Sequence, residues 1–198
     1  MHDDRLERTT DGAGRLAEIQ LRHLRELDAG AWMGEEHRGR KVPTLNETLA
    51  SIKGTARFIV DFKETRPELV EELVLSLKAD DMLDKAIVAS PSALVLQELA
   101  SAHPAIALAV PLRLVFSGPE PVALDRLKPK FLLARAADAT AAALAAASDA
   151  GVPSIVTLPR EMSATDSVAL ARTLESRGAS GVMTCRARAF LQTGLRML

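Results

Sequence analysis

The alternation of strand and helix patterns after residue 56 constrains the fold of this chain more than any other feature. Six short apolar segments have the length and composition of strands, and segments of helical periodicity separate them. Strand–helix–strand repeats of this kind build a parallel sheet through right-handed crossovers. The sequence therefore predicts an α/β fold, with strands at 56–62, 86–90, 105–110, 131–134, 153–158 and 181–184.

The segments between these strands predict the helices. Pro67 stands where a helix commonly begins, and Gly151 and Gly178 stand where helices commonly end. A further helix of this spacing is expected near the start of the chain, and Thr44 is of a residue type that caps the first turn of a helix. The expected helices span residues 16–27, 45–52, 67–79, 92–102, 122–127, 139–150 and 164–177.

The composition is that of an ordinary globular protein. Of 198 residues, 47% are hydrophobic and 26% are charged, which predicts one domain spanning residues 1–198. A formal net charge of −1 disfavours nucleic acid and a polybasic membrane contact as partners. Cys185 is the single cysteine, as is typical of a reducing compartment, and no apolar run has transmembrane length. We therefore expect no stable membrane insertion and a cytoplasmic location.

The first dozen residues carry the densest group of chemically active side chains. His2 is followed by Asp3 and Asp4, and a charged turn leads to Thr-Thr-Asp-Gly at 9–12. Histidine suits proton transfer because its ordinary pKa lies near the working pH. The grouping is typical of a strand end that passes into an active-site loop, whereas the first residues of a domain seldom carry such a group.

The residues His-Asp-Asp-Arg-Leu-Glu-Arg-Thr-Thr-Asp-Gly at 2–12 closely resemble the second signature of the glycerophosphodiester phosphodiesterase family. Three later stretches agree with that family in order and spacing. They are Leu-Asp-Ala-Gly-Ala-Trp at 27–32, Val-Pro-Thr-Leu-Asn-Glu-Thr-Leu at 42–49 and Phe-Ile-Val-Asp-Phe-Lys at 58–63. The resemblance is dense up to residue 63 and looser from there to the C-terminus.

The resemblance implies a β/α (TIM) barrel of parallel strands, which closes with eight strands. Six strands are counted here, so we expect the barrel to be N-terminally incomplete, with its first strands absent before His2. Such a barrel exposes strand edges, and self-association is then expected. An open doubly wound sheet is the alternative, but no glycine-rich phosphate loop follows any of the strands.

The resemblance also implies roles for individual residues. His2 is the candidate catalytic acid or base, with Asp3 as a candidate orienting carboxylate. Asp61 is the candidate ligand of a divalent metal, Mg²⁺ or Ca²⁺, at a position where similar proteins have glutamate, and Lys63 is the candidate phosphate-binding residue. The family's other metal carboxylates and its second histidine belong to a segment that has no match here.

Several of these residues also have structural interpretations. Asp61 and Lys63 lie on one side of a strand and could form a simple ion pair. Glu47 matches a family glutamate, but it could equally form a capping box with Thr44. Trp32 is expected to line the barrel mouth or to cover its edge. The triplet at 37–39, His-Arg-Gly, copies the family's first signature, but it follows the His-Asp motif and is interpreted as a charged loop.

Two functions remain open at this point. The first is a metal-dependent phosphoric diester hydrolase of lipid metabolism, which cleaves small glycerophosphodiesters to an alcohol and glycerol 3-phosphate, with reduced turnover in this chain. The second is a catalytically inactive barrel relative that acts as a binding or structural module. Departures from the family pattern at the strand ends favour the second function, and they fall at Ser90-Pro91, Val156-Thr157 and Thr184-Cys185-Arg186.

Overall fold

The computed structural model describes residues 1–54, 57–116, 123–185 and 187–190. These residues form two compact units, Met1–Ala56 and Arg57–Leu198. The predicted strand and helix starts at residues 56 and 122, and Arg186 of the last strand end, lie outside the described residues. The expectation of one domain over the whole chain stays a prediction.

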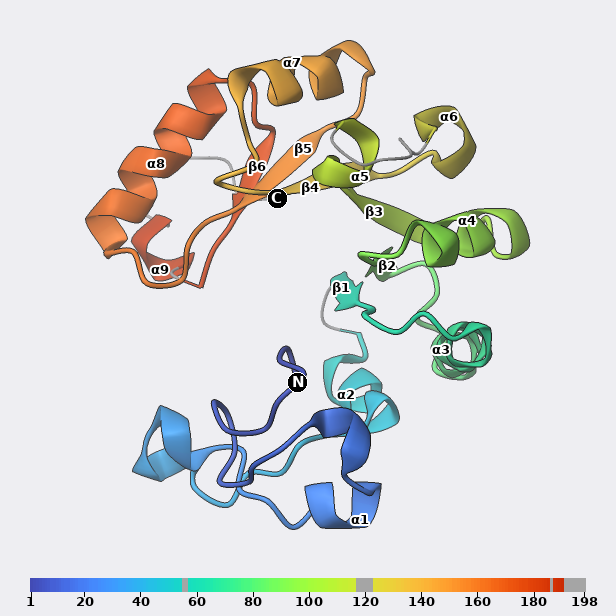
Figure 1. The fold of residues 1–198 in the computed structure, drawn as a ribbon, viewed down its shortest axis with the longest axis vertical. Helices are drawn as coiled ribbons and strands as arrows, with labels where there is room; N and C mark the ends of the chain where they lie inside the picture. The colour runs from blue at the N-terminus through green and yellow to red at the C-terminus, as the bar shows by residue number, and fades with distance from the viewer. Residues whose placement is uncertain (55–56, 117–122, 186, 191–198) are drawn as a thin grey trace. The chain divides into compact units, whose positions relative to one another are not determined.

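The second unit contains a six-stranded parallel sheet, as the sequence predicts (Figure 1). Its strands are hydrogen-bonded in chain order, so each neighbours the next along the sequence. In this register Val60 pairs with Val88, and Leu132 pairs with Ser154. The strands are β1 (Phe58–Asp61), β2 (Ala86–Ala89), β3 (Ala107–Pro111), β4 (Phe131–Arg135), β5 (Ser154–Thr157) and β6 (Gly181–Met183).

Seven helices connect or follow these strands in the part of the chain that the structure describes. Five were expected, but the sequence pattern missed α5 and α9. The helix α5 follows β3 without a loop, because Pro111 ends the strand and the next turn buries Leu112 and Val115 on one side. The helices are α3 (Pro67–Ala79), α4 (Ala93–Ala102), α5 (Leu112–Phe116), α6 (Leu124–Leu127), α7 (Ala141–Asp149), α8 (Ala164–Ser176) and α9 (Ala187–Phe190).

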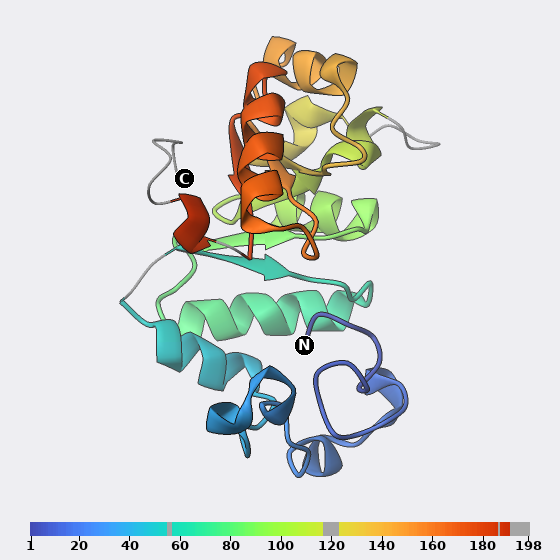
Figure 2. The same cartoon turned by 90° about the vertical axis from the view of Figure 1, so that its left-hand side faces the viewer.

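Successive side chains of the sheet alternate between two apolar faces. One face is covered by helices, with α4 against β3, α7 against β5 and α8 against β6 (Figure 1). Figure 2 shows α8 lying alongside β6. The strand residues of this face are almost fully buried: Val88, Leu108, Val110, Leu132 and Val156. This alternation explains why the strands are apolar throughout, as strands buried on both faces usually are.

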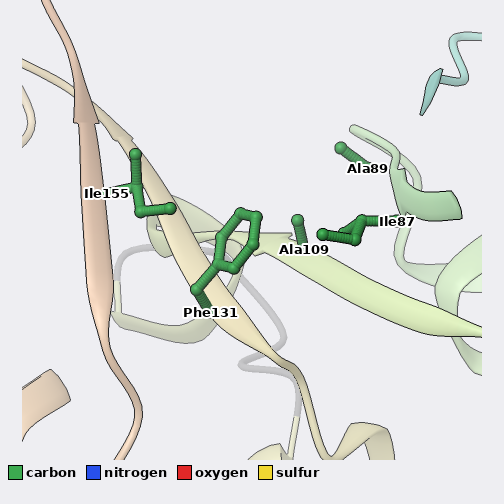
Figure 3. Close-up of a cluster of buried hydrophobic side chains, with 5 residues drawn as sticks. All are labelled: Ile87, Ala89, Ala109, Phe131 and Ile155. Atoms are coloured by element: carbon green, nitrogen blue, oxygen red, sulfur yellow. The ribbon is translucent and has the colours of Figure 1, made fainter. Parts of the chain in front are cut away.

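The other face of the sheet carries a second apolar cluster. Phe131 of β4 lies at its centre, between side chains from β2, β3 and β5 (Figure 3). Register places these residues on one side, since Ala109 pairs with Phe131. The buried members are Ile87, Ala89, Ala109, Phe131 and Ile155. In a parallel β/α sheet that curves toward a barrel, this is the face that points inward.

The first unit consists of short helical turns around a small core. Leu6, Leu24 and Val42 are its buried centre. The prediction of one helix over residues 16–27 is wrong, because the backbone is extended at Ile19 and Gln20. This break lets Ile19 pack against the core. The elements are η1 (Leu16–Glu18), α1 (Leu21–Leu24), η2 (Ala31–Met33), η3 (Glu35–His37) and α2 (Leu45–Ile52).

The helix α2 begins and ends where the sequence predicts. Thr44 is its N-cap, and its side-chain oxygen accepts a hydrogen bond from the backbone N–H of Glu47. The Glu47 carboxylate in turn accepts from the backbone N–H of Thr44 at 2.8 Å. The capping box that the sequence offered as one interpretation of Glu47 is therefore confirmed.

The expected count of six strands after residue 56 is also confirmed. Among the described residues, β1 and β6 are the two edges of the sheet. The further expectation, that two strands precede His2, stays a prediction. Within the same described part of the chain, no helix combines the length and the apolar character needed to cross a membrane.

Candidate active site

The first group of candidate site residues is a contact between His2 and Asp3. The Nδ1 atom of His2 lies 2.8 Å from Oδ1 of Asp3. The His2 side chain is 75% exposed and the Asp3 side chain is 26% exposed. The imidazole and the carboxylate are therefore in contact, and the imidazole is exposed to solvent, whereas their catalytic roles stay predictions.

Arg8 binds the same carboxylate from the other side. Its Nε donates to Oδ2 of Asp3 at 2.5 Å, and its Nη2 donates to Oδ1 at 2.9 Å. The hydrogen bonds from Arg8, and then the one from His2, hold the pKa of Asp3 well below its usual range. Asp3 is therefore an acceptor at neutral pH, with its two oxygens shared by two donors.

The guanidinium of Arg8 also lies over the ring of Trp32, 5.9 Å from the ring centroid. The indole Nε1 of Trp32 donates to the backbone carbonyl of Ala29 at 3.0 Å. The sequence interpretation gave Arg8 no role. The only feature of the sequence that could have indicated a role for Arg8 is its residue type. A guanidinium can bind a carboxylate and stack on an aromatic ring at the same time. The expectation that Trp32 lines or covers a barrel mouth stays a prediction.

Asp28 organises the loop that carries Trp32. Its carboxylate accepts hydrogen bonds from the backbone N–H groups of Gly30 at 2.8 Å, Gly39 at 2.7 Å and Ala31 at 3.0 Å. These bonds lower its pKa to about 2, with Gly30 the largest cause. Gly30 is required there, since a Cβ atom would lie 1.8 Å from the carbonyl oxygen of His37. The Asp-Ala-Gly spacing is a recognised turn signal that the sequence interpretation did not use.

The loop around Asp28 is joined to the opening segment by Asp11. The backbone N–H of Asp28 donates to Oδ1 of Asp11 at 2.7 Å, and the backbone N–H of Asp11 donates to the carbonyl of Asp28 at 3.1 Å. These two hydrogen bonds hold together two segments that are far apart in sequence. This join brings Trp32 within reach of Arg8.

Glu47 has a structural role in addition to the capping box. Its carboxylate binds both terminal nitrogens of Arg25, one of them at 2.7 Å. Arg25 also donates to the backbone carbonyl of Val42 at 3.2 Å. The pair with Arg25 is the main cause of the lowered pKa of Glu47, which is about 2. These contacts attach α2 to the segment before it, so Glu47 supports the first unit.

The second group of candidate residues lies at the carboxyl end of β1. Asp61 is the last residue of the strand and pairs in register with Ala89, which belongs to the inward-facing cluster. Its Oδ2 lies 3.3 Å from Nζ of Lys63, with side chains that are 52% and 43% exposed respectively. The interpretation of the two residues as an ion pair is therefore confirmed. Sites of parallel β/α folds are built at this end of the strands.

His2, Asp3, Arg8 and Trp32 belong to the unit Met1–Ala56, whereas Asp61 and Lys63 belong to the other unit. Within the described ranges, no group of three or more histidine, cysteine, aspartate or glutamate side chains is arranged to hold a metal ion. Asp61 is thus a single candidate ligand, and the described residues do not make a complete metal site. No reaction step can be assigned to a metal from these residues.

The triplet at 37–39 makes its contacts inside its own loop. Arg38 binds the carboxylate of Glu35 at 2.5 and 2.6 Å, His37 Nε2 lies 3.7 Å from a carboxylate oxygen of Glu36, and Gly39 donates to Asp28. These contacts agree with the interpretation as a charged loop. Cys185, the single cysteine, is a free and exposed thiol.

A cavity of about 420 Å³ lies at the opposite end of the sheet from Asp61. Arg57, Lys130 and Pro153 stand directly before their strands, so the cavity opens at the amino ends of the strands. Its apolar wall is formed by Phe58, Ile59, Ile87, Phe131 and Ile155. Since the sites of parallel β/α barrels lie at the carboxyl ends, this cavity is not the candidate active site.

By its fold, the chain is a parallel β/α protein with an imidazole–carboxylate pair and a carboxylate–lysine pair as its candidate chemical groups. The model of the glycerophosphoryl diester phosphodiesterase family matches residues 1–182. The chain therefore belongs to the glycerophosphoryl diester phosphodiesterase family, as the opening motif indicated.

Two curated relatives agree with this assignment. A glycerophosphodiester phosphodiesterase of Bacillus subtilis is 36% identical over a 95-residue alignment that covers 43% of this chain and 32% of the relative. A glycerophosphodiester phosphodiesterase of Caldanaerobacter subterraneus is 30% identical over a 95-residue alignment that covers 46% of this chain and 39% of the relative. The alignments thus cover about a third of the length of these relatives.

Solved structures share the fold. That of a glycerophosphodiester phosphodiesterase from Agrobacterium tumefaciens superposes with a TM-score of 0.74 at 20% identity, over 96% of this chain and 78% of the other. That of an Oleispira antarctica phosphodiesterase in complex with its product sn-glycerol 3-phosphate superposes with a TM-score of 0.71 at 24% identity, over 93% of this chain and 74% of the other. At these identities the likeness concerns the fold alone.

Proposed function

We propose that this protein hydrolyses small glycerophosphodiesters to an alcohol and glycerol 3-phosphate. The observation that carries the proposal is the hydrogen-bonded pair of His2 and Asp3, inside a family match that spans residues 1–182. The glycerol 3-phosphate product of the Oleispira antarctica relative supports the choice of substrate class. The two curated relatives are likewise glycerophosphodiester phosphodiesterases.

In this proposal His2 moves the protons of the reaction. Its Nδ1 donates to Asp3, so the lone pair of the neutral ring is on Nε2. This is the atom that would accept a proton from the attacking water or, when protonated, give one to the leaving alkoxide. Water supplies the attacking oxygen, so a new P–O bond forms to that oxygen while the P–O bond to the alcohol breaks. The phosphate stays on glycerol, and the released alcohol takes up a proton. The accessibility of the ring, which is 75% exposed, is compatible with either transfer.

Lys63 is proposed to bind a phosphate oxygen, and Asp61 is proposed as one ligand of a divalent metal, Mg²⁺ or Ca²⁺. A divalent cation bound near the phosphate would neutralise its negative charge. Lys63 and Asp61 form an ion pair across 3.3 Å in this structure. A metal ion that binds Asp61 would have to displace Lys63, and a phosphate that binds Lys63 would have to displace Asp61. Hard cations such as Mg²⁺ and Ca²⁺ prefer carboxylate oxygens as ligands. Asp61 is therefore a better candidate ligand than a histidine or lysine nitrogen.

The experiment is a hydrolysis assay with glycerophosphocholine in the presence of millimolar Mg²⁺ or Ca²⁺, read as released glycerol 3-phosphate. The His2→Gln variant is expected to lose turnover by roughly 100-fold or more, the contribution typical of a positioned acid or base. The His23→Gln variant is the matched control, since His23 is an exposed histidine of α1 that contacts Arg22. It is expected to keep the wild-type rate.

Equal rates for wild type and His2→Gln would contradict the assignment of His2. Binding of glycerol 3-phosphate without any turnover, in a protein that is folded by circular dichroism, would contradict the enzyme and favour the binding module. The absolute rate also tests the expectation that turnover is reduced in this chain.

A further inference from the structure

Arg8 is the residue around which the polar contacts of the opening segment are arranged. It takes both oxygens of Asp3, at 2.5 and 2.9 Å, while His2 shares one of the same oxygens at 2.8 Å. Its guanidinium also lies over Trp32. Arg8 is 42% exposed on its side chain, so it is neither a core residue nor a free surface charge.

The contact to Asp3 favours one of the two tautomers of the neutral His2 ring. An ionised carboxylate has no proton to donate, so the hydrogen in the His2–Asp3 contact belongs to Nδ1 of His2. The neutral ring then carries its lone pair on Nε2, which is the atom that can act as a base. If the Asp3 carboxylate turned away from His2, the ring would lose its preference for the tautomer with the hydrogen on Nδ1.

Arg8 restricts the orientation of Asp3. A fork of two parallel N–H donors defines the plane of the carboxylate as well as its position, which a single point charge does not. Trp32 restricts Arg8 in turn, and the hydrogen bond from Trp32 to Ala29 holds the indole on the loop that Asp28 organises. A chain of contacts therefore runs from that loop to the imidazole.

We propose that Arg8 is a positioning residue that acts through Asp3 to keep His2 in the tautomer with an unprotonated Nε2, and that Trp32 supports it. The consequence for turnover rests on the proposed function, whereas the consequence for the ring does not. Arg8 itself need not touch the substrate.

The first test is the tautomer of His2, read by side-chain ¹H–¹⁵N correlation spectra near pH 7.5 on the whole chain. The chain has four histidines, and His2→Gln identifies the signal of His2. The wild type is expected to show Nδ1 protonated, and Arg8→Gln is expected to show a mixture of the two tautomers. Arg8→Lys is expected to resemble Arg8→Gln, because an ammonium keeps the charge but lacks the fork.

The matched control is Arg5→Gln. Arg5 lies three residues from Arg8 and is also paired with a carboxylate, since its Nη2 lies 2.7 Å from Oε1 of Glu7. It makes no hydrogen bond to Asp3 among the described residues. Arg5→Gln is therefore expected to leave the His2 tautomer unchanged. An unchanged His2 spectrum in Arg8→Gln, with the fold intact by circular dichroism, would overturn the proposal.

The second test is a double-mutant cycle on kcat. Arg8→Gln is expected to lower kcat roughly 10-fold with little change in KM, less than the loss from removing the acid or base itself. In the Asp3→Asn background the same change is expected to have no further effect, because its route through Asp3 is already removed. A loss of equal size in both backgrounds, or a loss confined to KM, would mean that Arg8 acts on the substrate and would overturn the proposal.

The two tests separate this inference from the proposed function. A wild type without turnover but with the expected tautomer shift in Arg8→Gln would refute the hydrolase and keep the positioning role. A wild type with turnover but without the shift would do the reverse.

Discussion

The Nζ atom of Lys63 lies 3.3 Å from Oδ2 of Asp61, at the carboxyl end of β1. The two side chains are about half exposed, and Asp61 pairs in register with Ala89 of the inward-facing cluster. A carboxylate and an ammonium in this place neutralise each other while both remain open to solvent. Separating the two side chains would therefore break no buried contact, which is compatible with the proposed binding of a metal ion by Asp61 and of a phosphate by Lys63.

Asp61→Asn is expected to lower any metal-dependent turnover strongly and to leave the unfolding midpoint almost unchanged. An exposed ion pair contributes at most about 1 kcal/mol to folding, and asparagine keeps the shape of the side chain. Rates are to be compared over a titration of Mg²⁺ and Ca²⁺. Asp149→Asn, at the exposed end of α7, is the control. An unaltered metal dependence in Asp61→Asn would refute the role of Asp61 as a ligand.

The lowered pKa of Asp28 predicts that the protein loses stability in acid. Its pKa in the folded protein is about 2, below the ordinary value of 3.8, because three backbone N–H groups favour the carboxylate. The lowered pKa contributes stability that is fully present above about pH 4 and is lost as the pH falls toward 2. Urea unfolding at pH 7, 5 and 3 is expected to show this decline in the wild type.

Asp28→Asn is expected to be less stable than the wild type at pH 7, and the difference is expected to shrink at pH 3. The difference shrinks because asparagine cannot titrate, whereas the Asp28 carboxyl of the unfolded wild type binds a proton below its ordinary pKa of 3.8 and so favours unfolding. A difference that stays constant between pH 7 and pH 3 would show that the carboxylate charge is irrelevant to the loop.

Thr44→Ala is expected to destabilise the protein by about 1 kcal/mol, the usual cost of losing an N-cap hydroxyl. The hydroxyl oxygen accepts the backbone N–H of Glu47, which alanine leaves without this partner. Thr44→Ser keeps the hydroxyl and is expected to remain close to the wild type. Chemical denaturation of the three proteins side by side measures the effect, and equal losses in both variants would exclude the cap as its cause.

Leu132→Ala is expected to cost about 2–5 kcal/mol of the free energy of unfolding, because Leu132 is 0% exposed between the sheet and its helices. Leu94→Ala is the matched control, since Leu94 of α4 is 76% exposed. The control is expected to stay within about 0.5 kcal/mol of the wild type. Similar losses for the two leucines would contradict the packing of the helix-covered face.

The strands and most of the helices could be predicted from the sequence because their signals are local. The apolar run at 86–90 predicted β2 to within one residue, and the Thr44–Glu47 spacing predicted the start of α2. The helix predicted over 16–27 failed for a tertiary reason. Its apolar spacing was helical, but the backbone is extended at Ile19, whose partly buried side chain packs against the core of the first unit.

The candidate site was predicted only where neighbouring residues form it. His2 with Asp3, and Asp61 with Lys63, are separated by one or two positions, so chain geometry almost guarantees their contact. Arg8 lies five positions from Asp3 and far from Trp32 in sequence. No residue pattern states which of several arginines will bind that carboxylate.

The sequence by itself therefore determined the parallel β/α fold, the family and the residues that can do chemistry. These follow from burial periodicity and from residue type, which act over a few positions of the chain. Only the tertiary structure decided that Arg8, which lies over Trp32, takes both oxygens of the carboxylate that contacts His2. Such an arrangement depends on the Asp11–Asp28 join between distant segments, and the geometry of that join exists only after the chain has folded.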